Sequence, residues 1–239
     1  PLDAMTSADE VARRFERNDW ISAPVVDPQG KLLGRITIDD VVDVIREQAD
    51  HSLAVMAGLG DGDVFTTVLA TAPQRAIWLA INLATAILAA SVIAFYQDTI
   101  EKVVALAVLM PIVASMGGIA GTQSLTVLIR AMAMGQINDR TEIWLVRREI
   151  FVSIINGLIW AFVIAIIAAY WFDDTTLGLI IAFAIIINLI TAGIAGASLP
   201  LILDRLRIDP ALAGGVVLTT ITDVVGFFAF LGVAAYFYN

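Results

Sequence analysis

The sequence predicts an α-helical membrane protein, in which five transmembrane helices follow a small α/β module and a connecting helix. Two observations lead to this fold class. Hydrophobic residues make up 59% of the 239-residue chain and the mean hydropathy is +0.86, whereas soluble domains are about 45–50% apolar. The charges are also unevenly placed, because the region 1–75 holds more than half of the acidic residues. A polar N-terminal region therefore precedes a membrane region.

The N-terminal region carries helix and strand signals in alternation. Ser7 and Glu10 stand at the spacing of a capping box, which predicts a helix start. In the turn DPQGK, Gly30 can take a positive φ. A unit of this size is too small for a large core and is expected to lean on a partner. The expected elements are a helix over 8–17, strands over 23–27 and 32–38, and a helix over 41–57.

The membrane region divides into five apolar runs, each roughly 20 or more residues long and so able to cross about 30 Å of hydrocarbon. These spans are expected near 76–97, 103–129, 150–171, 177–203 and 211–237. The whole chain then has three parts, which are a module at 1–38, a connecting helix with its linker at 39–75, and a transmembrane domain at 76–239.

Basic residues gather at alternate junctions of the spans, and this asymmetry predicts the orientation. One set of junctions holds Arg75, Arg130, Arg140, Arg147, Arg148, Arg205 and Arg207. The opposite junctions hold Lys102 and the acids Asp98, Glu101, Asp173 and Asp174. We therefore expect a multi-pass protein of the cell (inner) membrane, surrounded by lipid, with a cytoplasmic N-terminus and an external C-terminus.

Composition excludes several classes of function. The chain has no cysteine and a single histidine, His51, so thiolate and histidine-rich metal sites are not expected. A net charge of −9 without a basic patch argues against nucleic-acid binding. No nucleophile–base pair or cofactor loop is apparent, so an enzyme is not expected. The chain begins at Pro1, which is expected of a fragment or a processed form.

The fifth span contains one carboxylate, Asp223, within the stretch LTTITDVVGFF. Gly215, Thr219 and Asp223 are four residues apart and so share one helix face, with Thr220 beside them. An ionisable group at this depth is first a functional hypothesis. The functional interpretation is a cation site made of the carboxylate, hydroxyls and exposed carbonyls. The alternative is a protonated or hydrogen-bonded structural aspartate.

The second span contains LMPIVASMGGIAGTQSLT. Pro111 removes a backbone donor and should kink the helix. Gly117 and Gly121, with Gly118 beside them, form a small-residue face that lets two helices approach closely, and packing alone would explain it. The asparagines within the spans are interpreted as interhelical hydrogen-bonding residues rather than ligands. They are Asn82, Asn156 and Asn188.

The connecting helix carries an acidic stripe, because Asp39, Asp43, Glu47 and Asp50 are spaced four, four and three residues apart, with Asp40 next to the first. Such a stripe is usually a solvated face. Like charges at this spacing are mildly unfavourable, however, unless a cation neutralises them. A divalent cation would do so, and Asp209 at the start of the fifth span could complete that site. Both interpretations stay open.

All candidate ligands are oxygen atoms, which favours hard cations such as Mg²⁺, Ca²⁺ or Mn²⁺. One carboxylate cannot cage Ca²⁺, but it could hold a Mg²⁺ that keeps most of its waters. Pairing two chains would bring two Asp223 side chains around one axis and match the charge of a divalent ion. We therefore expect a homodimer.

Four of the five spans resemble the MgtE family of magnesium channels or transporters. The matching stretches are MPIVASMGGIAGTQSLTVLIR, REIFVSIINGLIWA, NLITAGIAGASLPLILDRLRIDPALAGG and TTITDVVGFFAFLGVA, in the family order. The first 57 residues resemble the second CBS module of that family, through APVVDPQGKLLGRITIDDVVDVI and the helix that follows. The resemblance implies a homodimeric pore lined mainly by the second and fifth spans.

The resemblance also implies roles for particular residues. The family's pore carboxylate falls on Asp223, and Gly117, Gly118 and Gly121 would line or shape the pore. The family's Mg²⁺-sensing acids fall on Asp39, Asp40, Asp43, Glu47 and Asp209. CBS modules often bind adenine nucleotides through a Thr and an Asp spaced like Thr37 and Asp40, although a single module offers an incomplete site.

Three departures from the family pattern are visible. The acidic N-terminal domain and the first CBS module are absent from this chain. The family's EEATED stretch is EQADHS here, from Glu47 to Ser52, so several sensor carboxylates are missing. Val216 replaces a proline that commonly follows the glycine of the fifth span. The first two departures bear on Mg²⁺-dependent closure, and the third bears on local helix opening near Gly215.

The sequence therefore predicts a channel or transporter that passes Mg²⁺ into the cytoplasm, selected by the Asp223 pair and gated by the acidic cytoplasmic helix, with Mg²⁺ as both substrate and regulator. The alternative is a proton-coupled or exchange-type carrier of divalent cations, in which Asp223 is the proton site. A third possibility is a sensor or scaffold whose spans only anchor it.

Overall fold

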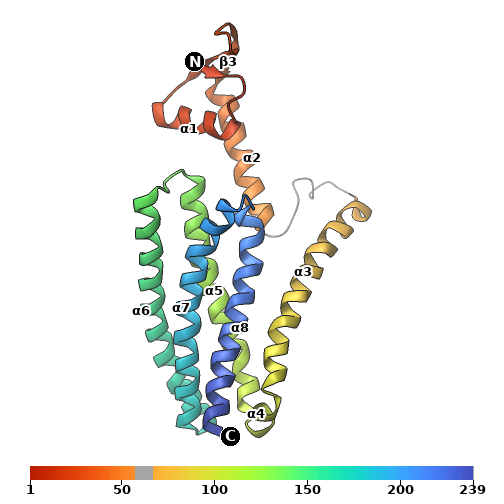
Figure 1. Cartoon of the computed structure of the whole chain (residues 1–239), viewed down its shortest axis with the longest axis vertical. Coiled ribbons are helices and arrows are strands. Elements are labelled where there is room, and N and C mark those ends of the chain that lie inside the picture. Colours follow the sequence, from red (N-terminus) through yellow and green to blue (C-terminus); the bar gives the residue numbers. More distant parts are fainter. Residues whose placement is uncertain (57–66, 239) are drawn as a thin grey trace. The chain divides into compact units, whose positions relative to one another are not determined.

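The computed structural model describes residues 1–56 and 67–238, and residues 57–66 of the predicted linker lie outside the described part. The chain folds into two compact units, 1–71 and 72–239. The predicted fold class is confirmed, since long helices dominate and a small α/β unit precedes them (Figure 1).

Residues 1–56 of the N-terminal unit form two helices and a three-stranded sheet of order β1-β2-β3, in which β1 pairs in parallel and β3 antiparallel with β2. Ser7 caps the first helix by accepting a hydrogen bond from the Glu10 N–H, as the capping-box spacing predicted. Gly30 has a positive φ of 82°, as expected from its place in the turn. The short strand β1 was not predicted. The elements are β1 Leu2–Asp3, α1 Ala8–Asn18, β2 Ser22–Val26, β3 Leu32–Thr37 and α2 Ile38–Met56.

The core of this unit is small. Leu2 from β1, Phe15 from α1 and Val41 from α2 are buried together, and Trp20 meets Phe15 edge to face with ring centroids 5.7 Å apart. The sheet also leaves apolar side chains in solvent, among them Leu33, which is 58% exposed. The unit therefore buries only a small core by itself, as its length predicted.

Five helices in the described part of the second unit are long and apolar enough to cross a membrane, which matches the predicted number. A short helix, α4, follows the first of them and was not predicted. The helices are α3 Val68–Phe95, α4 Gln97–Lys102, α5 Ala105–Ala133, α6 Asp139–Phe172, α7 Thr175–Arg205 and α8 Pro210–Tyr238.

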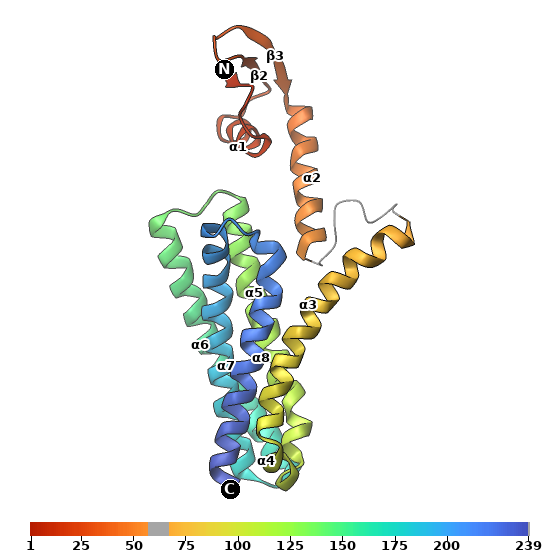
Figure 2. The same ribbon diagram turned by 45° about the vertical axis from the view of Figure 1, so that its right-hand side comes forward.

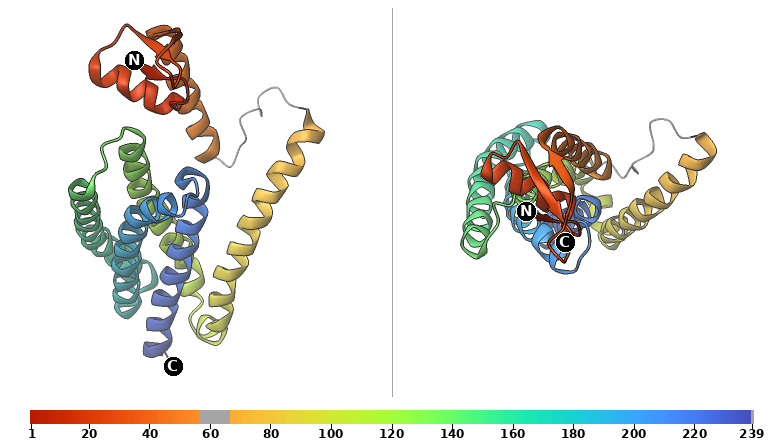
Figure 3. Two further views of the ribbon diagram at one scale, coloured as in Figure 1. Left: turned by 45° about the horizontal axis from the view of Figure 1, so that its top comes forward. Right: turned by 90° about the horizontal axis from the view of Figure 1, so that it is seen from above.

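Helix α7 is the centre of the bundle, since it packs against α5, α6 and α8. Helix α3 follows the bundle only near α4, where Ala89 is buried, and its N-terminal half diverges from it (Figures 1 and 2). The large apolar side chains of that half, such as Ile77 and Leu79, are exposed. Figure 3 shows the same arrangement from two further directions.

Helix α6 begins about ten residues before its predicted span. The Asn138 side chain caps it by accepting hydrogen bonds from the N–H groups of Arg140 and Thr141, and the Thr141 hydroxyl oxygen accepts one from the Asn138 N–H. This capping box starts the helix in the polar loop. Arg147 and Arg148 therefore belong to the helix, where their long side chains remain exposed. Hydropathy located the apolar core of this helix but not its polar first turns.

The two ends of the bundle carry different links between helices. At one end, Arg205 of α7 forms an ion pair with Glu142 of α6 at 2.8 Å. At the other end, Asp174 caps α7 and accepts a hydrogen bond from the Tyr238 hydroxyl of α8. That hydroxyl lowers the pKa of Asp174 below its ordinary value, against an opposing effect of burial.

Candidate cation pathway in the membrane unit

Asp223 lies in the middle of α8, on a helix face that the chain leaves partly exposed. No hydrogen bond or ion pair to its side chain occurs within residues 1–56 and 67–238. A carboxylate at this depth without a protein partner keeps all its acceptor capacity for a ligand or for water. Gly215, two turns earlier, faces open space, since a Cβ there would meet nothing within 4 Å.

The hydroxyls beside Asp223 all donate to their own helix. Thr219 Oγ1 donates to the Gly215 and Val216 carbonyls, both at 3.1 Å, and Thr220 Oγ1 donates to the Val216 carbonyl at 2.7 Å. Both residues are half-buried. Because a hydroxyl has one proton and two lone pairs, each oxygen remains an acceptor. This face of α8 therefore presents acceptors and no positive charge.

Helix α5 adds a similar face beside α8. The two helices approach at Gly118, where a Cβ would lie 3.9 Å from Thr219 Cγ2. The Thr122 and Thr126 hydroxyls of α5 are exposed and donate backwards to the Gly118 and Thr122 carbonyls, each at 2.8 Å. We call these partly exposed groups of the two helices the acceptor face. It consists of Gly118, Thr122, Thr126, Gly215, Thr219, Thr220 and Asp223.

Two of the glycines named from the sequence lie elsewhere. Gly117 is buried against the side chain of Asn188, and Gly121 is buried against Leu218, whose Cδ1 would lie 2.9 Å from an added Cβ. Both therefore allow close helix contact behind the acceptor face, whereas Gly118 is only half-buried. Spacing alone places Gly117 and Gly121 on one helix face and Gly118 to the side of it, but it does not show which of these faces is buried.

Asn188 of α7 is fully buried where α5, α7 and α8 meet. Its Nδ2 donates to the Val113 carbonyl of α5 at 2.8 Å, which agrees with the interhelical role expected for it. Asn82 and Asn156 behave differently, because each donates to a carbonyl of its own helix. No local sequence pattern distinguishes these three asparagines.

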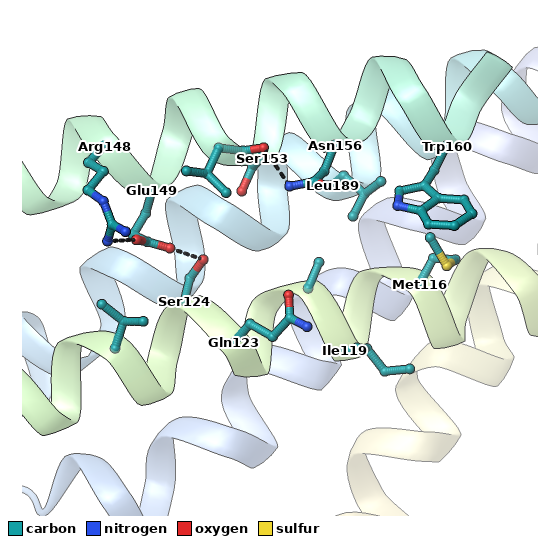
Figure 4. A pocket seen from close by; sticks show the side chains of 13 residues that line it. Met116, Ile119, Gln123, Ser124, Arg148, Glu149, Ser153, Asn156, Trp160 and Leu189 are labelled. Atoms are coloured by element: carbon teal, nitrogen blue, oxygen red, sulfur yellow. Dashed lines mark hydrogen bonds and ion pairs between the residues drawn. The ribbon is translucent and has the colours of Figure 1, made fainter. Parts of the chain in front are cut away.

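A second polar cluster lies between α5 and α6 and was not predicted from the sequence. Glu149 is 5% exposed, accepts the Ser124 hydroxyl at 2.9 Å and pairs with Arg148 at 2.9 Å (Figure 4). These side chains border a cavity of about 430 Å³ that Gln123, Asn156 and Trp160 also line. Both carboxylate oxygens of Glu149 are therefore satisfied, so the cluster joins two helices rather than offering free ligands.

The acids of α2 are exposed, and the side chain of Asp50 lies outside the described residues. No group of three or more acidic or histidine side chains positioned to hold a metal occurs in the described part of the chain. Asp39, Asp43 and Glu47 thus follow the helix as a charged stripe. Asp209, in the other unit, accepts the Ala211 N–H at 2.8 Å at the start of α8.

Thr37 and Asp40, expected as a nucleotide pair, are adjacent at the start of α2. The Thr37 N–H and hydroxyl both donate to Asp40 Oδ2 at 3.0 Å. The bond from the Thr37 N–H, and to a smaller extent the bond from its hydroxyl, lower the pKa of Asp40 below its ordinary value. The pair satisfies an N–H group at the helix start in the manner of a cap.

Comparison with known proteins identifies the family of the chain. Residues 110–233, which include all of α7 and nearly all of α5 and α8, match the model of the MgtE family, described as a divalent cation transporter. The chain belongs to the MgtE family. Residues 2–47 match the CBS domain, which covers the N-terminal unit as far as the middle of α2.

Three curated MgtE relatives align with nearly the whole chain. Each is named "Magnesium transporter MgtE". The Bacillus subtilis protein is 36% identical over 98% of this chain and 52% of its own length. The Thermus thermophilus protein is 33% identical over 96% of this chain and 51% of its own length. The Enterococcus faecalis protein is 31% identical over 96% of this chain and 51% of its own length. The chain thus spans about half the length of these relatives.

Proposed function

We propose that this chain forms the ion pathway of a Mg²⁺ channel or transporter, in which two copies pair their acceptor faces around one axis. The observation that carries the proposal is Asp223, a carboxylate in mid-membrane with no protein partner in the described residues. A lone charge there is costly unless water or a cation accompanies it. The names of the curated relatives support Mg²⁺ as that cation.

Charge and hydration both favour a dimer. One acceptor face holds one negative charge, whereas two faces hold the two charges that offset a divalent ion. Mg²⁺ gives up its water reluctantly and usually keeps several water ligands. The lone pairs of Thr219 and Thr220 are suited to accept hydrogen bonds from those waters. Selection would then depend on the size and charge of the hydrated ion rather than on direct ligation.

The proposed orientation places the basic end of the bundle in the cytoplasm of a cell with an inner membrane. That end carries Arg130 in the last turn of α5, Arg140 in the first turn of α6, Arg205 in the last turn of α7, and Arg207 in the loop that follows. At the opposite end, Asp98, Glu101 and Asp173 would raise the local concentration of cations near the entrance. Mg²⁺ would then move inward, down its electrochemical gradient.

The proposed gate is the acidic stripe of α2, with Asp40 and Asp209 as further carboxylates. Binding of cytoplasmic Mg²⁺ to Asp39, Asp43 and Glu47 would relieve the repulsion between like charges on one helix face. This would make Mg²⁺ a regulator as well as a substrate. Thr37 and Asp40 are the proposed contacts for an adenine nucleotide. Binding through these side chains would replace the hydrogen bonds by which they cap the start of α2.

The proposal is tested by Mg²⁺ uptake into liposomes that contain the purified chain. Asp223→Asn keeps the shape and removes the charge, and uptake should fall at least about tenfold, the lower end of the loss seen when outer contacts of metal sites are removed. Asp204→Asn is the matched control, because it removes an exposed carboxylate at the end of α7. Excess Ca²⁺ should compete weakly with Mg²⁺ in the unmodified chain.

Other outcomes would identify the alternatives. Unchanged uptake in Asp223→Asn would make this carboxylate structural and would overturn the proposal. Saturable uptake that depends on a pH gradient would favour the proton-coupled carrier. No uptake by the unmodified chain would favour a membrane-anchored sensor.

A further inference from the structure

Asn188 is placed where three helices meet, directly behind the acceptor face. Its side chain is fully buried, Nδ2 donates to the Val113 carbonyl of α5, and Oδ1 is buried without a partner among the described residues. A buried amide oxygen without a partner is unfavourable and calls for an explanation. The fold retains this amide although an apolar side chain of similar size would carry no such penalty.

Glycines on both neighbouring helices make room for the amide. A Cβ at Gly226 of α8 would lie 2.6 Å from Asn188 Nδ2 and 3.0 Å from Val113 Cγ1, and a Cβ at Gly117 of α5 would overlap the same amide. Real Cβ atoms do not approach neighbours so closely. Glycine is disfavoured inside helices, so two glycines around one side chain indicate that α5 and α8 are shaped to fit Asn188.

Both glycines that accommodate the amide lie next to the acceptor face. Gly226 follows Asp223 by three residues, or about 4.5 Å along the helix axis. Gly117 precedes Gly118, which is the point of approach between α5 and Thr219. A change at Asn188 would therefore shift or rotate both helices where Asp223 lies.

We propose that Asn188 is the positioning residue of the ion pathway, which sets the spacing of α5 and α8 at the depth of Asp223 and thereby the preference for Mg²⁺ over Ca²⁺. Its effect on selectivity rests on the proposed function, whereas its effect on helix spacing does not. Asn188 itself stays behind the face and contacts no ion. Its action passes through Val113, Gly117 and Gly226.

Helix spacing is measured by cross-linking, which is straightforward because the chain has no cysteine. Cysteines are introduced at Gly118 and Thr219, where α5 and α8 approach and a Cβ at position 118 would lie 3.9 Å from Thr219 Cγ2, so that their rate of disulfide formation reports the spacing of the two helices. Asn188→Leu should slow disulfide formation by roughly fivefold to tenfold, the population change expected from loss of one buried hydrogen bond. Asn156→Leu is the matched control, because Asn156 bonds only to its own helix, and it should leave the rate unchanged.

Selectivity is measured as the ratio of Mg²⁺ to Ca²⁺ uptake in the same liposomes. Asn188→Leu should lower this ratio at least about threefold, while Asn156→Leu retains it. A uniform fall in both fluxes would indicate a purely structural role and overturn the proposal. If the unmodified chain shows no uptake, the proposed function fails, and the cross-linking rate still decides whether Asn188 sets the helix spacing.

A paired substitution keeps the test valid if single variants fold poorly. Gly226→Ala should reduce the yield of folded protein, because its methyl group would overlap Asn188. Asn188→Ala removes the overlapping atoms, so the double variant should recover yield while its cross-linking rate and flux ratio stay altered. Recovery of an unaltered rate and ratio in the double variant would show that the amide is dispensable and would refute the proposal.

Discussion

Two polar regions of the membrane unit differ in how their side chains are satisfied. Around α7, Asn188, Ser124 and Glu149 are buried and bonded to a neighbouring helix. On the acceptor face, Thr219 and Thr220 bond only to carbonyls of their own helix, and Asp223 bonds to nothing in the described residues. Polar groups that satisfy one another hold helices together, whereas groups that keep free acceptors are available to a passing ion.

The glycines sharpen this comparison. Gly196 of α7 is buried, and a Cβ there would lie 2.6 Å from the Gly121 carbonyl oxygen of α5. A Cβ added at Gly215, on the acceptor face, would meet nothing within 4 Å. One glycine is therefore required by packing, whereas at the other the described part of the chain leaves room for a side chain.

The largest effect on stability is expected from Gly196→Ala. The added methyl group must push two backbones apart, and such overpacking costs about 1–3 kcal/mol or more. Gly215→Ala should instead be neutral or stabilise its helix by about 0.5–1 kcal/mol, because alanine is the better helix former. Thermal unfolding of the detergent-solubilised variants measures both. Equal stability of the two would contradict the division into two regions.

The next largest effect is expected from Ser124→Ala. It leaves one oxygen of the buried Glu149 without a donor, which costs about 1–3 kcal/mol. Thr126→Ala, on the acceptor face of the same helix, removes a hydroxyl that bonds only to its own backbone, so its stability should change by about 0.5 kcal/mol or less. Unfolding midpoints of the two variants provide the measurement, and a more destabilised Thr126→Ala would reverse the assignment.

Composition and hydropathy were sufficient to predict the five spans and the α/β unit, because both depend on local sequence. Asp223 was recognisable because a charge inside an apolar run is rare. Glu149 was placed at a span boundary, since the start of α6 depends on the Asn138 cap rather than on hydropathy. The distinct environment of Asn188 depends on residues 75 positions away in sequence, which no local pattern encodes.

A smaller effect, on flux alone, is expected from Thr219→Val. Valine keeps the shape of threonine and removes the hydroxyl, so a hydrated ion loses one hydrogen-bond acceptor. Uptake of Mg²⁺ should fall roughly twofold to tenfold, the range that corresponds to one hydrogen bond. Stability should hardly change, because the hydroxyl bonds only to the Gly215 and Val216 carbonyls. A loss of stability that matches the loss of flux would place Thr219 among the packing residues instead.

The smallest effect is expected from the hydrogen bond between Tyr238 and Asp174, which lies at the end of the bundle and outside the acceptor face. The Tyr238 hydroxyl lowers the folded-state pKa of Asp174 below the ordinary value of 3.8. The link therefore contributes stability above pH 3.8 and loses it as the pH falls through the lower folded-state pKa. Asp174→Asn keeps a competent helix cap and should lower stability by about 1 kcal/mol or less near neutral pH.

That difference from the unmodified chain should shrink toward pH 3, as thermal unfolding between pH 6 and 3 would show. Uptake of Mg²⁺ at neutral pH should stay within about twofold, since Asp174 caps α7 at the end of the bundle and lies outside the acceptor face. A loss of uptake as large as that of Asp223→Asn would instead extend the pathway to this end of α7 and α8. The distinction between structural and ion-facing carboxylates would then fail at Asp174.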